Sequence, residues 1–378
     1  MARDINSRIA RLNSRRKGLD RVGRVSTQAS QEILNKSLYQ EDWQSRSKKE
    51  YTRYALGSMQ EVGKEYTGVS IETANRVADQ LRSGLESEGY SVDFRLQGSV
   101  PLNVHIRGVS DVDLLTLDIA FLTYYSFGSM AKAGRYTAST SKTSVGVLSS
   151  LRTASEAILE RRYPAATVDK TGAKAISIYG GSLARSVDVV PSHWHDNEEY
   201  QLSQDQSDRT VTILNNKNKT TIDNLPFLHI KNVTIVDNET NGGIKKAIRL
   251  CKNVKNDAIE EGTPIELPSF DIASLIYHID RNAVSLNSVY ELSVLAETQR
   301  FLDVLYNNEG YAKSLRTPDN SRFIIDNNEK YSAVRRLSIE VDDLAKEVAK
   351  EQADRYIGSG EISLSDSRAT LNSRLIIE

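Results

Sequence analysis

The segment from Gln97 to Leu117, which reads QGSVPLNVHIRGVSDVDLLTL, restricts what this chain can fold into more than any other. Asp111 and Asp113 flank a valine directly before an apolar run that begins at Leu114, so both acids mark the start of a strand. Side chains two positions apart on a strand project to the same face of the sheet. The sequence therefore predicts two carboxylates that point the same way from the beginning of a buried strand.

Paired carboxylates on a rigid strand suit Mg²⁺, which binds one or two carboxylates and completes its shell with water and substrate phosphates. Gly98 and Ser99 precede the acids in the same segment. Gly98 has no Cβ, so the backbone there can approach a phosphate closely, and the Ser99 hydroxyl and N–H can donate to it. A surface turn with two alternating acids is the other interpretation. For an isolated Asp-x-Asp that interpretation would be preferred.

A third acid, Asp188, lies in the run SVDVVPS. The flanking valines share one face of the predicted strand, and Asp188 points to the other. Taken alone, Asp188 is explained equally well by a backbone amide cap or an ion pair with Arg185. Three acids on neighbouring strands, however, can hold the two divalent ions that stabilise the attacking and leaving oxygens of an in-line displacement. With Asp111 and Asp113 present, a catalytic role for Asp188 is favoured.

A helix predicted to begin at Gly242 or Gly243 carries a row of cations, Lys245, Arg249 and Lys252, opposite its apolar stripe. Such a row usually faces solvent, but beside a metal site it could hold a triphosphate. The later segment LPSF starts another apolar helix, where backbone N–H groups and the Ser269 hydroxyl would make an anion site. Phe270 offers a ring on which a base could stack, and core packing is its alternative role.

Two further segments would surround this region. The run SIETANRVADQLRSGLES predicts an amphipathic helix that Ser70 caps and Gly89 ends, and that backs the sheet. The segment from Tyr124 to Thr143 is rich in Gly, Ser, Thr, Lys and Ala. That composition predicts either a lid over the substrate or a plain surface loop.

The length of 378 residues is sufficient for two lobes. The chain has 49 basic and 50 acidic residues, so no net charge draws it to nucleic acids or anionic membranes, and a long polymer is not an expected obligatory substrate. The single cysteine, Cys251, excludes an internal disulfide and fits a reducing cytoplasm. Because no apolar run has spanning length, we expect a soluble cytoplasmic protein.

The QGS…SDVDLL block, SVDVVPS, the NGG…RLCKN helix and LPSF, in this order, resemble the cGAS/DncV-like nucleotidyltransferases (CD-NTases). These are the cyclic-oligonucleotide synthases of bacterial anti-phage (CBASS) systems. The resemblance spans about Val69 to Val341. The first block is shared by the whole polymerase-beta-like nucleotidyltransferase superfamily, and the later blocks narrow it to this family. One departure is visible, because many relatives have Gly-Thr where Asn103 and Val104 stand.

The resemblance implies an α+β fold. Residues 61–225 would form a polymerase-beta-like nucleotidyltransferase core, a mixed sheet backed by helices. Residues 226–378 would form a helical C-terminal lobe, with the active site in the cleft between the two. Residues 1–60 would form an N-terminal helical arm.

The resemblance also implies roles for individual residues. The catalytic residues, which also hold two Mg²⁺ ions with Mn²⁺ as the alternative metal, would be Asp111, Asp113 and Asp188. The nucleotide-binding residues would be Gln97, Gly98, Ser99, Lys252, Ser269 and Phe270. Lys252 and Ser269 would contact the terminal phosphates, and Phe270 would stack on a nucleobase.

The implied reaction joins NTPs, ATP among them, into a cyclic di- or oligonucleotide that a separate effector protein reads. It needs no obligatory nucleic acid and no membrane. A 3′-hydroxyl of one nucleotide would attack the α-phosphorus of another, with Asp188 helping to activate the hydroxyl. The alternatives are a toxin-type transferase that modifies tRNA or a protein hydroxyl, a linear oligonucleotide synthase, and a nucleotide sensor without catalysis.

Overall fold

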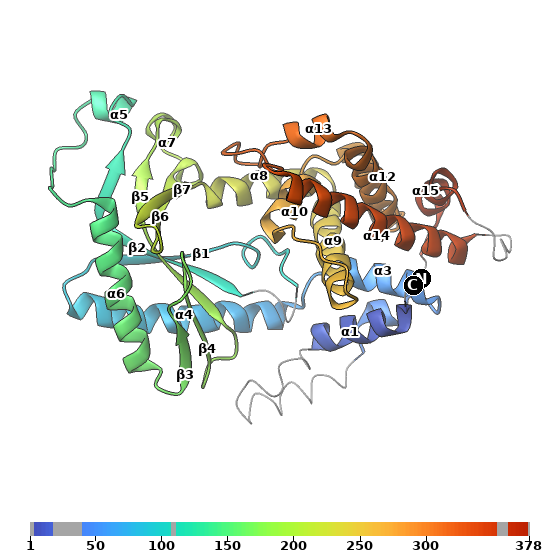
Figure 1. Ribbon diagram of the computed structural model, residues 1–378, viewed down its shortest axis with the longest axis horizontal. Helices are drawn as coiled ribbons and strands as arrows, with labels where there is room; N and C mark the ends of the chain where they lie inside the picture. Colours follow the sequence, from blue (N-terminus) through green and yellow to red (C-terminus); the bar gives the residue numbers. More distant parts are fainter. Residues whose placement is uncertain (1–3, 18–39, 107–110, 354–361, 377–378) are drawn as a thin grey trace.

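The computed structural model describes residues 4–17, 40–106, 111–353 and 362–376. The molecule is elongated, with a sheet and its covering helices at one end and a bundle of helices at the other (Figure 1). The chain passes from the sheet into the helical lobe through α8 (Pro226–Glu239). The fold class expected from the sequence, a mixed sheet backed by helices plus a helical C-terminal lobe, is confirmed.

One mixed sheet of seven strands organises the first lobe. Its strands are β1 (Val92–Gln97), β2 (Val112–Tyr124), β3 (Ala166–Asp169), β4 (Ile176–Gly180), β5 (Val187–Asp196), β6 (Thr210–Asn215) and β7 (Thr220–Asn224). The main order is β1-β2-β5-β4-β3, and β6 pairs with β5 and β7. β2 and β5 run parallel, whereas the other pairs are antiparallel. The first residues of β2 and β5 therefore lie at the same edge of the sheet.

The side chains of β2 and β5 alternate between two separate apolar clusters. Leu114 and Val189 pack with α4 (Lys64–Ser87) and α6 (Ser144–Arg162), which cover one face of the sheet. Leu115 and Val190 pack on the opposite face. Since alternate residues of a strand point to opposite faces, the acids that neighbour these positions point away from the layer formed by α4 and α6.

Helix α4 begins at Lys64, about two turns before its predicted start. The Ser70 hydroxyl is inside the helix, where it donates to the Tyr66 carbonyl at 3.0 Å, so the prediction of Ser70 as the cap is wrong. The apolar stripe continues backwards through the buried Tyr66, and Gly63 takes the capping position. The predicted end is confirmed, because Gly89 follows the helix with a positive φ of 87°.

The second lobe is built around α9 (Gly243–Glu260), which packs against helices on several sides. The other helices of this lobe are α10 (Ser269–Ile276), α11 (Arg281–Ser285), α12 (Ser293–Asn307), α13 (Glu309–Ser314), α14 (Asn328–Gln352) and α15 (Leu364–Ser373). Short helical segments elsewhere are α5 (Ser129–Lys132), α7 (Glu198–Ser203), and the 3₁₀ turns η2 (Asp42–Gln44), η3 (Gln206–Asp208) and η4 (Leu286–Ser288). None of the helices in the described ranges is long and apolar enough to cross a membrane.

The N-terminal helices α1 (Ile5–Lys17) and α3 (Glu50–Met59) share the apolar core of the helical lobe. Arg15 of α1 donates to both carboxylate oxygens of Asp257 in α9, each at 2.8 Å. The described part of the predicted N-terminal arm therefore packs with the C-terminal helices. Residues 18–39 of that arm lie outside the described residues.

Candidate active site

The three acids singled out from the sequence meet at one edge of the sheet. Asp113 in β2 lies beside Asp188 in β5 in the parallel register, and Asp111 directly precedes β2. Because paired positions of adjacent strands project to the same face, these two strand carboxylates point the same way, away from α4 and α6. The structure brings the acids together, and their catalytic roles stay predictions.

Two serines that the sequence analysis did not single out bind these acids. The Ser186 hydroxyl donates to Asp111, and the Ser177 hydroxyl donates to Asp188 at 2.5 Å. Ser186 stands two positions before Asp188, so its place in SVDVVPS was an available signal. Ser177 lies in β4 opposite Asp188, a pairing that depends on strand order and register.

Burial and mutual repulsion disfavour the ionised acids. Burial, followed by the charges of Asp188 and Asp111, raises the pKa of Asp113 to about 7. Burial also raises the pKa of Asp188, with the charge of Asp111 adding to it and the hydrogen bond from Ser177 opposing it. A divalent cation between these carboxylates would relieve the repulsion and favour their ionised state.

The three carboxylates fit a metal ion whose remaining coordination positions are filled by the substrate. Among the described side chains, no group of three or more His, Cys, Asp or Glu residues is placed to hold a metal ion by itself. Mg²⁺ requires no such cluster, because it is usually bound through one or two carboxylates and by substrate phosphates. Asp113 and Asp188 in register, with Asp111 at the strand entry, provide ligands of this type.

Gly98 lets the turn after β1 lie against Asp113. Gln97, at the end of β1, pairs with Asp113, and Gly98 follows with a φ of 77°. A Cβ at position 98 would collide with the Oδ2 atom of Asp113. The Ser99 carbonyl accepts the Val104 N–H at 3.0 Å, which closes the turn. The predicted phosphate-binding residues therefore lie directly beside the acids.

Two buried cations of α9 hold this turn. Arg249 Nη1 donates to the Asn103 carbonyl and Lys252 Nζ donates to the Val104 carbonyl, each at 2.7 Å. Their residues are only 5% and 3% exposed. Asn103 has a φ of 58°, a left-handed conformation that asparagine adopts more readily than most residues. The local backbone therefore explains how asparagine is accommodated in this turn.

The sequence suggested that the three cations of α9 could form one row facing the site. In the structure they do not form such a row. Lys245 pairs with Asp237 at 3.4 Å, whereas Arg249 also donates to the Met59 carbonyl. The reason is that neighbouring helices surround α9, so part of its polar face is buried as well. Lys252 remains near the acids. Burial lowers its pKa to about 7, against the charge of Asp113, which raises it.

Replacing Lys252 tests which of two roles its ammonium has: holding the turn through the Val104 carbonyl, or contacting the phosphates of the nucleotide. We expect Lys252→Met to lower the free energy of unfolding by about 1–3 kcal/mol, because the buried Val104 carbonyl loses its donor. The catalytic efficiency should fall for every NTP alike. Urea denaturation and steady-state kinetics measure the two effects, with Lys245→Met as the control from the same helix. Unchanged stability together with a raised KM would identify Lys252 as a phosphate contact only.

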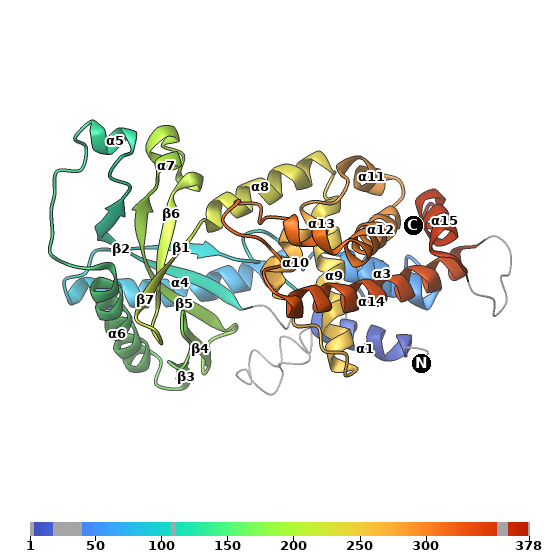
Figure 2. The same cartoon turned by 45° about the horizontal axis from the view of Figure 1, so that its top comes forward.

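Ser269 and Phe270 begin α10, as predicted. Phe270 is 39% exposed, so it is not a core residue. Its ring stacks on His229 with 4.4 Å between centroids, and the Arg322 guanidinium carbon lies 5.3 Å from its centroid. No hydrogen bond or ion pair between described residues joins Ser269 to the three acids, but α10 lies on the side of the helical lobe that faces the sheet (Figures 1 and 2).

The segment from Tyr124 to Thr143 is not a lid over the acids. β2 extends to Tyr124, so the segment starts roughly 36 Å along the strand from Asp113 at about 3.3 Å per residue. Figure 1 shows α5, which this segment contains, at the far end of the sheet from the helical lobe. The lid interpretation is therefore wrong, and the segment is a surface connection.

Comparisons with known proteins agree with this architecture. Residues 231–344 match the cGAS/DncV-like nucleotidyltransferase C-terminal helical domain. The chain is 41% identical over 362 residues to the cyclic dinucleotide synthase CdnE of Yersinia aleksiciae, with 93% of each protein covered. It is 30% identical over 300 residues to the c-di-GMP synthase of Capnocytophaga granulosa, covering 73% of this chain and 81% of that protein.

A solved structure shows the same fold. The structure of the STING-associated CdnE c-di-GMP synthase from Capnocytophaga granulosa superposes with a TM-score of 0.68 at 27% identity, covering 90% of this chain and 97% of that one. The family expected from the sequence motifs is thus confirmed by sequence and by fold. The chain belongs to the cGAS/DncV-like nucleotidyltransferase family and is a nucleotidyltransferase of the cyclic-oligonucleotide-synthase class.

Proposed function

We propose that the protein joins two NTPs into a cyclic dinucleotide in a reaction that needs two Mg²⁺ ions at Asp111, Asp113 and Asp188. The observation that carries this proposal is the parallel register of Asp113 and Asp188 beside the turn that begins at Gly98. The similarity to c-di-GMP synthases at 30% and 31% identity favours GTP as a substrate.

The side chains around the acids have distinct tasks in this proposal. The backbone at Gly98 and the Ser99 hydroxyl orient the donor triphosphate through N–H and O–H donors. Asp188 accepts the proton of the attacking 3′-hydroxyl, and its hydrogen bond from Ser177 fixes the carboxylate. Bound Mg²⁺ would supply charge stabilisation for the attacking and leaving oxygens. Arg249 and Lys252 hold the turn after β1 in place through their hydrogen bonds to its backbone carbonyls.

Ser269 and Phe270 would recognise different parts of the nucleotide. Ser269→Ala should weaken triphosphate binding for every NTP alike, because the hydroxyl at the start of α10 donates to a phosphate. Phe270→Ala should lose about 1–3 kcal/mol of base stacking and leave tripolyphosphate binding unchanged. Isothermal titration with NTPs and with tripolyphosphate measures both effects.

Phe323→Ala is a matched control for Phe270→Ala. Phe323 is 49% exposed and also lies against an arginine, with the Arg316 guanidinium carbon 4.6 Å from its centroid. The control should bind NTPs like the unchanged protein. If Phe270→Ala also retains full NTP affinity, Phe270 does not stack on the base.

Product formation tests the proposed reaction directly. The protein is incubated with four labelled NTPs and Mg²⁺, and products that resist phosphatase are separated and identified. A phosphatase-resistant dinucleotide supports cyclisation. A product whose terminal phosphates are removed points to a linear oligonucleotide synthase. No product from NTPs alone, with label transferred to added tRNA or protein, points to a toxin-type transferase.

The cellular role follows from the same resemblance. We assign the product to anti-phage (CBASS) signalling, with a separate effector protein as its reader and the cytoplasm as the place of synthesis. The relative from Capnocytophaga granulosa is STING-associated, which supports an effector that binds a cyclic dinucleotide. The test is a phage challenge of cells that carry the gene together with its neighbouring genes. The same cells encoding Asp113→Asn serve as the comparison and should lose resistance to the phage.

A further inference from the structure

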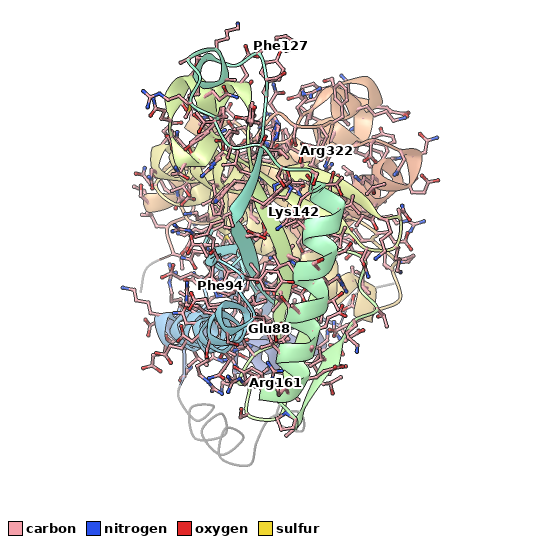
Figure 3. The ribbon with its side chains drawn as sticks, turned by 90° about the vertical axis from the view of Figure 1, so that its left-hand side faces the viewer. Glu88, Phe94, Phe127, Lys142, Arg161 and Arg322 are labelled. Carbon is pink, nitrogen blue, oxygen red and sulfur yellow. The ribbon has the colours of Figure 1, made fainter. Side chains whose placement is uncertain are left out.

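A cavity lies on the sheet face opposite the three acids. Its volume is about 570 Å³, and its walls include Glu88, Tyr90, Asp118, Phe121, Lys142 and Ser150. It opens where α4 ends and α6 begins. Figure 3 faces this end of the molecule and labels Lys142 near the start of α6 and Glu88 near the end of α4.

The cavity is separate from the candidate active site. Asp118 and Asp113 both belong to β2 but stand five positions apart. An odd separation on a strand turns the two side chains to opposite faces, and five residues span roughly 17 Å. A ligand on Asp118 would therefore contact the layer of α4 and α6, and not the three acids.

Asp118 is a buried carboxylate with spare acceptor capacity. It is 8% exposed, and its Oδ1 atom accepts the Ala120 N–H at 2.9 Å. That bond supports the irregular register between β2 and β5 at this point. The Oδ2 atom accepts no hydrogen bond from the described residues, although Asp118 lines the cavity. A ligand in the cavity that carries N–H donors can therefore bond this oxygen.

Among the described residues, Asp118 supplies the unpaired negative charge at this end of the cavity. Glu88 also lies in the wall beside Tyr90, but its carboxylate pairs with Arg161 at 3.5 Å. Burial raises the pKa of the Tyr90 hydroxyl, and the charges of Glu88 and Asp118 add to the effect. Tyr90 therefore stays protonated and can itself donate or accept a hydrogen bond. With the Asp118 carboxylate as acceptor, this end of the cavity favours a ligand group that carries N–H donors.

A positive group stands elsewhere on the wall. The Lys142 ammonium makes no ion pair within the described part of the chain, and Lys142 stands two positions before the start of α6. The hydroxyls of Thr140 and Thr143 accompany it. Apolar surface from Phe121 and Val147 completes the wall. The cavity thus offers donors for an anion, an apolar surface, and a carboxylate for paired N–H groups.

We propose that this cavity binds a guanine nucleotide. Guanine presents the N1–H and N2–H₂ donors side by side, and a carboxylate accepts such a pair with its two oxygens. Its phosphate would be bound by Lys142. Adenine presents an acceptor at N1 and would repel Asp118. The proposal concerns binding outside the active site and does not depend on which NTPs the enzyme joins.

Isothermal titration of GMP, AMP and guanosine, without divalent ions, tests the proposal. GMP should bind the unchanged protein at least ~10-fold more tightly than AMP, and Asp118→Asn should weaken GMP binding by at least ~10-fold, as expected for a lost charged acceptor. Lys142→Ala should weaken GMP binding several-fold and leave guanosine binding unchanged, because guanosine has no phosphate. Equal affinity for GMP and AMP overturns the proposal, as does full GMP binding by Asp118→Asn.

Three further variants locate the bound GMP. Ser150→Trp should block GMP without changing any charge, since Ser150 is an exposed residue of the cavity wall, and it serves if Asp118→Asn fails to fold. Lys132→Ala, an exposed lysine outside the wall, should bind GMP normally. Phe270→Ala should also retain the binding that depends on Asp118. Complete loss of GMP binding in Phe270→Ala would place GMP in the active site and overturn the proposal.

Discussion

Replacing Asp111 and Asp113 together by asparagine is expected to abolish nucleotide transfer, lowering the rate by at least ~10³-fold, while the fold persists. Asparagine keeps the shape of each side chain but removes the charges that would bind Mg²⁺. In the presence of EDTA, the free energy of unfolding should stay level or rise by about 1–3 kcal/mol at pH 8, because two repelling charges are removed. Loss of the interaction between Asp113 and Lys252 reduces this gain.

The expected gain in the free energy of unfolding of the double variant, relative to the unchanged protein, should increase with pH. The pKa of Asp113 is raised from 3.8 to about 7 in the folded protein, so the folded state holds this proton more tightly than the unfolded state. The protonated Asp113 carboxyl group therefore contributes to the free energy of unfolding below pH 4, and this contribution is lost as the pH rises to 7. The unchanged protein should lose this contribution over that window, and the double variant should not. Urea denaturation in EDTA at pH 5 and pH 8 measures the difference.

Mg²⁺ provides an independent measurement for the same variant. Added Mg²⁺ should raise the melting temperature of the unchanged protein, because an ion that binds only the folded state stabilises it. The double variant should show no such rise. Asp93→Asn, which removes an acid paired with the exposed Arg95 on the neighbouring strand, is the control and should respond to Mg²⁺ normally. A large loss of stability at pH 8 in EDTA would show that the acids are structural.

Gly98→Ala is expected to lower the rate of nucleotide transfer by at least ~10²-fold with a modest loss of stability. A Cβ at this position meets the Oδ2 atom of Asp113, and that carboxylate must turn away from the position it shares with Asp188. The φ of 77° adds backbone strain of about 1–2 kcal/mol. Product formation under saturating NTP and urea denaturation measure the two effects.

Gly262→Ala is the control that separates the collision with Asp113 from the backbone strain of an alanine at positive φ. Gly262 has a φ of 87°, and a Cβ there meets no atom within 4 Å. The control should lose about the same stability as Gly98→Ala and keep its activity. Similar activity of both variants would mean that the backbone at position 98 has no special relation to Asp113.

Local patterns were sufficient to find the acids. Alternation along a strand and an apolar run after Asp113 are properties of neighbouring residues, so Asp111, Asp113 and Asp188 could be identified one strand at a time. The start of α10 at Ser269 was equally local, since Pro268 and the apolar run behind it lie next to it in the chain. The motif order then indicated the family, which the comparisons confirm.

Long-range packing decided what the same patterns could not. Lys245, Arg249 and Lys252 share helical spacing, yet only the helices that surround α9 determine that two of them are buried and bind the carbonyls of Asn103 and Val104.

The sequence by itself determined which side chains share a strand face, because that depends on backbone geometry within a few residues. The tertiary structure alone decided which strands are neighbours, and therefore that Ser177 meets Asp188. It also decided that β2 continues to Tyr124, away from the acids, and that Asp118 lines a cavity on the opposite face. Contacts between residues far apart in the chain follow from how whole elements pack, which no short stretch of sequence encodes.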